Sequence, residues 1–155
     1  MMSRLSLLLR ERTGNVTIEL ALLAPILGAM LIGLIDISTA YSDKLRLEQV
    51  AQRTVEKVMQ NSFLVSQVAT LETEAEAAAG AGSNATVTYW LECNAVVQTP
   101  MATAYTVGCP EGQQYGRYFQ IAITKDYTPM ILSSTVGTGM NGNITLTGTA
   151  GIRIQ

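Results

Sequence analysis

The chain contains no histidine, and only 14% of its 155 residues are charged. Histidine is the side chain most often used for acid–base chemistry near neutral pH and the commonest metal ligand. Ordinary soluble domains have about 25% charged residues. The ten basic residues do not outnumber the twelve acidic ones, so binding to nucleic acid has no electrostatic basis. We therefore expect no enzyme, no catalytic residues, no metal site, no cofactor and no nucleic-acid partner.

The apolar residues are concentrated in one run. Residues 20–35 read LALLAPILGAMLIGLI, without a single charge. Sixteen helical residues rise only about 24 Å, and the hydrocarbon core of a bilayer is about 30 Å thick, so a span must include the flanks of the run. We predict a transmembrane helix over residues 15–41. Pro25 is expected to kink this helix because proline removes one backbone donor.

The segment before the run has the features of a leader. Residues 1–14, MMSRLSLLLRERTG, carry three arginines and one glutamate. A basic segment before an apolar helix favours the cytoplasmic side. Four basic residues also follow the run, so this count alone leaves the orientation open: Lys44, Arg46, Arg53 and Lys57.

The order of residues around the run is specific. A basic leader ends in Gly14, Glu19 is the fifth residue after it, and the apolar run contains Ala24-Pro25. This arrangement resembles a prepilin-type N-terminus. It is most similar to the TadE/TadG-like family of pseudopilins from tight-adherence (Flp-type) pilus systems. The short chain leaves no room for the long extracytoplasmic module of the larger TadG-type members, which favours a TadE-like minor pilin.

The resemblance implies a mechanism of maturation and assembly. A prepilin peptidase would cleave between Gly14 and Asn15 on the cytoplasmic side, leaving the apolar helix in the mature protein. The new amino group at Asn15 lies one helical turn from Glu19. In an assembly, the amine of one subunit would neutralise the glutamate of the next and so remove a costly intramembrane charge.

The resemblance also implies location and partners. The chain would be a single-pass protein of the bacterial inner membrane with an extracytoplasmic C-terminal domain, acting in pilus assembly for surface adhesion. Its partners would be the prepilin peptidase, other pilin and pseudopilin subunits, the inner-membrane assembly platform and membrane lipid.

Two alternatives compete with this interpretation. The small residues Ser38-Thr39-Ala40 suit a signal peptidase, which would release a secreted, β-rich binding domain beginning at Tyr41. The chain could also remain uncleaved from Met1, as a membrane-anchored subunit of an envelope complex. The mature N-terminus separates the three hypotheses.

The region after the apolar run reads first as helix. We predict an amphipathic extracytoplasmic helical region over residues 42–83. Its first part has apolar or small residues at spacings of three and four, and its second part, about residues 62–79, stops at Gly80. Three glutamates in the second part are expected on a solvated face: Glu72, Glu74 and Glu76.

From residue 84 the hydrophobic period changes from 3.6 to 2. We predict a small antiparallel β-domain over residues 84–155, with strands in 85–97, 118–124 and 144–154 and a glycine-rich loop over 128–143. The fold class is therefore α+β: a long N-terminal membrane-spanning helix continues as an amphipathic helix, which packs on a small antiparallel β-sheet.

Three residues of the β-domain are further candidates. The only two cysteines, Cys93 and Cys109, favour a disulfide if the domain is exported, and such a bond would contribute about 3 kcal/mol. Trp90 lies on the strand face opposite Leu91. It is a candidate exposed contact residue, with burial in another layer as the alternative.

Overall fold

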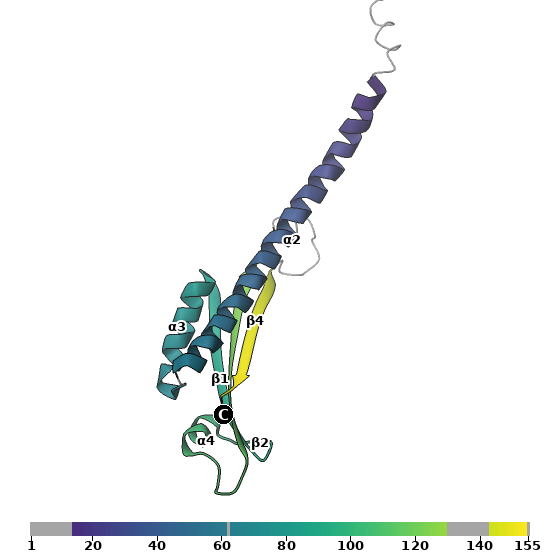
Figure 1. Cartoon of the computed structure of the whole chain (residues 1–155). Helices are drawn as coiled ribbons and strands as arrows, with labels where there is room; N and C mark the ends of the chain where they lie inside the picture. Colours follow the sequence, from purple (N-terminus) through teal and green to yellow (C-terminus); the bar gives the residue numbers. More distant parts are fainter. Residues whose placement is uncertain (1–13, 62, 130–142, 155) are drawn as a thin grey trace, which may run out of the picture. The chain divides into compact units, whose positions relative to one another are not determined.

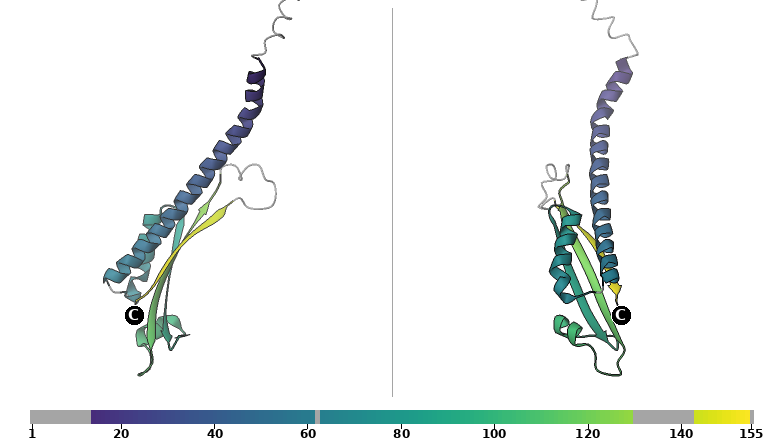
Figure 2. Two further views of the ribbon diagram at one scale, coloured as in Figure 1. Left: turned by 45° about the vertical axis from the view of Figure 1, so that its right-hand side comes forward. Right: turned by 60° about the vertical axis from the view of Figure 1, so that its left-hand side comes forward.

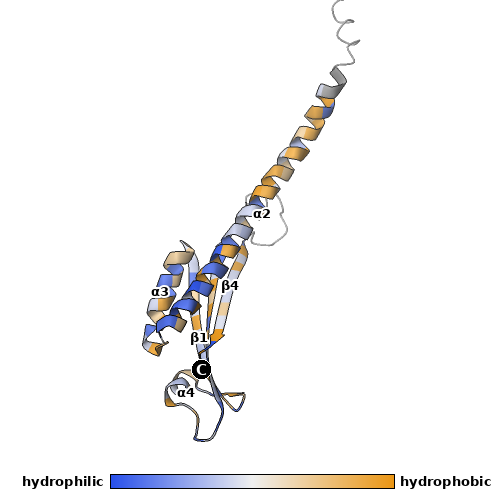
Figure 3. Ribbon diagram, viewed as in Figure 1, coloured by the Kyte–Doolittle hydropathy of each residue, from blue (hydrophilic) through white to orange (hydrophobic). Residues whose placement is uncertain are grey.

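The computed structural model describes residues 14–61, 63–129 and 143–154. The chain divides into two compact units, Met1–Ser38 and Thr39–Gln155. Helix α2 (Gly14–Asn61) belongs to both. In the first unit it supplies all the described residues, which are predominantly apolar, and in the second it supplies a more polar stretch, as Figure 3 shows.

The second unit is built on a four-stranded antiparallel sheet in the order β2-β1-β3-β4 (Figure 1). The strands are β1 (Ser83–Cys93), β2 (Val96–Val97), β3 (Tyr115–Tyr127) and β4 (Ile144–Arg153). The sheet and the helix packed on it confirm the predicted α+β fold class.

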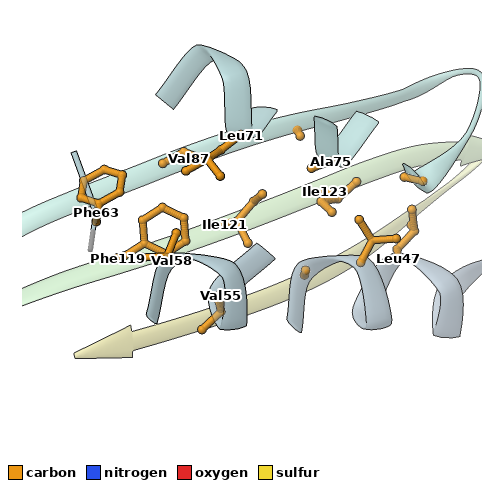
Figure 4. Packing of buried hydrophobic residues seen from close by; sticks show 14 of the residues in the cluster. Leu47, Val55, Val58, Phe63, Leu71, Ala75, Val87, Phe119, Ile121 and Ile123 are labelled. Atoms are coloured by element: carbon orange, nitrogen blue, oxygen red, sulfur yellow. The ribbon is translucent and has the colours of Figure 1, made fainter. Parts of the chain in front are cut away.

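Two helices cover one face of this sheet (Figure 2). They are residues 39–61 of α2 and helix α3 (Val68–Ala79), which follows a short 3-10 turn η1 (Val65–Gln67). Alternate residues of the strands face the helices, and Phe119, Ile121 and Ile123 at the centre of β3 have no exposed surface. Figure 4 shows the helix side chains converging on these residues, with α3 on the β1 side: Leu47, Val55, Val58, Leu71 and Ala75.

An aromatic cluster closes one end of this core. Phe63 contacts the rings of Tyr89, Tyr105 and Phe119 at centroid distances of 5.5, 5.6 and 5.0 Å. Tyr105 comes from helix α4 (Met101–Val107), which the sequence patterns did not predict. Burial raises the pKa of the Tyr105 phenol, and the nearby Arg117 guanidinium, 5.4 Å from the ring centroid, opposes this shift.

The predicted strand over residues 85–97 is interrupted. β1 ends at Cys93, and Asn94 and Ala95 form a tight turn with φ of 50° and 65° before β2 begins. Two consecutive residues with positive φ are typical of the type I′ turns that join hairpin strands. Apolar and polar residues alternate through this turn, so the period-2 pattern gave no sign of it. Most of the predicted loop over 128–143 lies outside the described residues.

The helix and the sheet approach each other closely at Gly148 of β4. A Cβ atom at this position would lie 2.5 Å from the Leu47 carbonyl carbon and 2.6 Å from the Glu48 nitrogen. Both are backbone atoms of α2, so they cannot rotate away as a side chain does. A glycine within an alternating strand often marks a close backbone approach, and β4 contains two, Gly148 and Gly151.

We expect Gly148→Ala to lower the free energy of unfolding by about 1–3 kcal/mol, because the added methyl group forces α2 away from β4. Gly151→Ala is the matched control in the same strand, since its Cβ would lie 3.3 Å from the Phe119 carbonyl oxygen and meet no helix backbone. Thermal unfolding of the full chain in detergent, followed by circular dichroism, measures both. Equal stability of the two variants would contradict this account of the packing.

Candidate membrane and assembly site

Residues 17–38 of α2 present a mainly apolar surface. All the large hydrophobic side chains from Ile18 to Ile37 are between 44% and 70% exposed. By length and composition, one helix among the described residues is long and apolar enough to cross a membrane. None of the residues in its most apolar stretch is buried inside the protein. An apolar surface of this extent requires a covering, which lipid or other apolar helices provide.

The predicted cleavage and assembly residues lie at the start of this helix. α2 begins at Gly14, so Asn15 and Glu19 are one helical turn apart along the same side. The Glu19 side chain is exposed between the exposed side chains of Ile18 and Leu20. It forms no hydrogen bond or ion pair with any residue in the described ranges. A carboxylate at the centre of a membrane costs about 2.5–3.5 kcal/mol, so an inserted Glu19 would gain from a cationic partner.

The structure does not test two of the sequence predictions, the kink at Pro25 and the leader. Pro25 lies inside α2, and the helix runs through it without a break. The kink stays a prediction, and residues 1–13 of the predicted leader lie outside the described part of the chain.

The structure joins Cys93 and Cys109 in a disulfide. Cys93 is the last residue of β1, and Cys109 follows α4, so the bond ties β2 and α4 to the end of the central strands. The backbone amide of Asn94 also donates to the Gln114 carbonyl oxygen at 2.8 Å, and the Gln114 amide donates to Asn94 Oδ1 at 3.1 Å. The disulfide and the two hydrogen bonds between Asn94 and Gln114 together fix this end of the sheet.

The predicted solvated face of α3 is corrected by the structure. Glu72 Oε1 accepts a hydrogen bond from the Val87 amide at 2.8 Å, and Glu76 Oε1 accepts one from the Ala85 amide at 3.0 Å. Both amides point away from β3, at the outer edge of β1. Only Glu74 meets the expectation of an exposed residue, and it pairs with Lys57. The three glutamates are spaced two residues apart, and this spacing did not indicate that two of them face the edge of β1. Their partners depend on where α3 lies in the tertiary structure.

Trp90 lies on the face of the sheet opposite the helices and is half-buried. Its ring stacks on its cross-strand neighbour Tyr118, with centroids 5.2 Å apart and planes 7° apart, and its Nε1 donates to Glu92 Oε1 at 3.1 Å. The side chain is thus packed within the open face of the sheet. Within the described residues, no group of three or more histidine, cysteine, aspartate or glutamate side chains could hold a metal ion.

An exposed apolar helix that continues into a helix packed on an antiparallel sheet defines an α+β protein with an N-terminal candidate membrane anchor. Residues 14–55 match the family model described as TadE-like protein, so this part of the chain is similar to the TadE-like family. The matched residues all lie in α2, and none lies in the sheet. No curated protein and no solved structure matches the chain.

Removing either edge-binding carboxylate should destabilise the sheet unit. We expect Glu72→Ala and Glu76→Ala each to lower the free energy of unfolding by about 1–3 kcal/mol, because a backbone amide of β1 loses its acceptor. Glu74→Ala is the matched control on the same helix and should cost less than about 1 kcal/mol, since it removes only an exposed ion pair. Thermal unfolding compares the three variants, and a cost for Glu74→Ala as large as the others would argue against edge binding.

Proposed function

We propose that the chain is a TadE-like minor pilin or pseudopilin that takes part in assembling a tight-adherence (Flp-type) pilus for surface adhesion. One observation carries this proposal: the TadE-like match over residues 14–55 coincides with a single exposed apolar helix that begins at Gly14 and carries Glu19 in its second turn. In this proposal the chain is not an enzyme. Its role is to be anchored in the membrane and to pack against other subunits.

The proposed maturation begins at the start of α2. The basic leader holds the N-terminus on the cytoplasmic side while the apolar part of α2 enters the inner membrane. A prepilin peptidase then cleaves between Gly14 and Asn15. Glycine suits this position because it has no side chain to obstruct the enzyme. The product keeps the apolar helix and gains a positively charged amino group at Asn15.

The proposed assembly step uses this new charge. The amine at Asn15 of one subunit neutralises Glu19 of a neighbouring pilin or pseudopilin subunit within the apolar layer. A buried pair of this kind contributes register more than stability, because a subunit in the wrong register leaves an unpaired charge in lipid. The inner-membrane assembly platform would bring the helices together, and the unit Thr39–Gln155 would remain extracytoplasmic, where its disulfide is stable.

The mature N-terminus tests the proposal directly. The full chain, produced together with the pilus machinery and isolated from membranes, should begin at Asn15 in intact-mass measurement and N-terminal sequencing. Gly14→Val should block this processing because the branched side chain obstructs the scissile bond. Gly28→Val is the matched control in the same helix, where nothing lies within 4 Å of the added Cβ. A mature chain beginning at Tyr41 would support the secreted domain, and one beginning at Met1 the uncleaved anchor.

Glu19→Ala separates cleavage from assembly. We expect normal cleavage but at least tenfold less incorporation into fibres, since loss of one ionic partner in lipid costs more than about 1.4 kcal/mol. Incorporation is measured by immunoblot of sheared fibres against the membrane fraction. Glu48→Ala is the control, because Glu48 lies in the same helix and makes only an exposed contact of 3.9 Å with Lys44. Unimpaired assembly of Glu19→Ala would contradict the proposed pairing.

A further inference from the structure

A groove of about 480 Å³ lies between α2 and α3, just after the apolar part of α2 ends. Its lining combines two cationic side chains, two neutral polar ones and three apolar ones: Arg46, Arg53, Ser42, Gln49, Leu45, Val50 and Ala78. No carboxylate lines it. It is therefore a positively charged groove in a chain whose net charge is −2.

Arg46 is held in place by the end of α3. Its Nε and Nη2 donate to the Ala78 carbonyl oxygen at 3.2 and 2.9 Å. A guanidinium has five N–H donors, so these bonds leave three for a ligand. Preorganisation of this kind reduces the entropy lost when an anion binds.

Arg53 is distinguished from the other basic residues that follow the apolar run. Lys44 lies 3.9 Å from Glu48, and Lys57 pairs with Glu74. The Arg53 side chain, two turns along α2 from that of Arg46, has no hydrogen bond or ion pair with any part of the chain that the structure describes. Its charge is thus available to a ligand in the groove.

The lining residues point to the chemistry of that ligand. Guanidinium groups bind phosphate through paired, charge-assisted hydrogen bonds. Ser42 and Gln49 add neutral donors, and Leu45, which is 38% exposed, adds an apolar wall. A phosphate carried on an apolar body satisfies both parts of the lining better than a free phosphate ion does.

We propose that this groove binds the phosphate of one anionic phospholipid, with Arg46 and Arg53 on the phosphate and Leu45 against the apolar part of the lipid. The proposal rests on the proposed insertion of α2 into the membrane. It also accounts for basic residues on the side of the span where the usual distribution of charge does not place them.

Native mass spectrometry of the full chain in a mild detergent tests this binding. With phosphatidylglycerol added, we expect one lipid to be retained per chain, and about tenfold less retention with phosphatidylcholine. Arg53→Gln should lower phosphatidylglycerol retention about tenfold, because charge-assisted bonds to the phosphate are lost. Arg153→Gln, the same change at an exposed position on β4, should leave retention unchanged. Inorganic phosphate in excess should not displace the lipid.

Three results would overturn the inference: equal retention of the two lipids, unchanged retention in Arg53→Gln, or displacement of the lipid by inorganic phosphate. Fractionation of the same cells separates this failure from failure of the proposed function. A chain found in the membrane fraction that retains no phosphatidylglycerol refutes only the lipid site. A chain absent from the membrane fraction refutes the membrane insertion on which both proposals depend.

Discussion

The burial of one face of α2 against β3 and β4 is the contact on which the rest of the second unit depends. Leu47 and Ala51 are almost completely buried, and the helix backbone reaches β4 closely only because Gly148 has no side chain. This contact covers one half of the sheet face, and α3 covers the other. Lys125 Nζ, bonded to Asp43 Oδ2 at 2.9 Å, and Thr39, bonded to Tyr127 at 2.7 Å, add polar links between the same elements. A shift of α2 would therefore expose the core and break these links together.

The outer edge of β1 shows how the polar groups of this small unit are satisfied. The carboxylates of Glu72 and Glu76 bind two outward amides, and the Gln98 amide donates to the Leu91 carbonyl oxygen at 2.8 Å beyond them. An unprotected edge strand is a template for unwanted pairing, so these bonds both stabilise the strand and block it. The same helix supplies the Ala78 carbonyl oxygen that positions Arg46, which links edge protection to the shape of the groove.

One helix thus serves two environments, and its sequence changes accordingly. Residues 17–38 of α2 expose large apolar side chains along most of their length, which suits lipid or other apolar helices. Residues 39–61 have one apolar stripe and a polar remainder, which suits a helix lying on a sheet in water. The TadE-like match covers both stretches but not the sheet. The helix is therefore the part of the chain that carries the similarity to the family.

The sequence alone was sufficient for the features that depend on local pattern. The apolar run predicted the first part of α2, the three-and-four spacing predicted its buried stripe, and the alternation of residues predicted three strands. The order of Gly14, Glu19 and the run was enough to suggest the family. Helix α4, the turn at Asn94, the role of Gly148 and the partners of Glu72 and Arg46 required the tertiary structure. Each of them depends on which backbone lies beside a residue in space, and hydrophobic periodicity reports only whether a residue is buried.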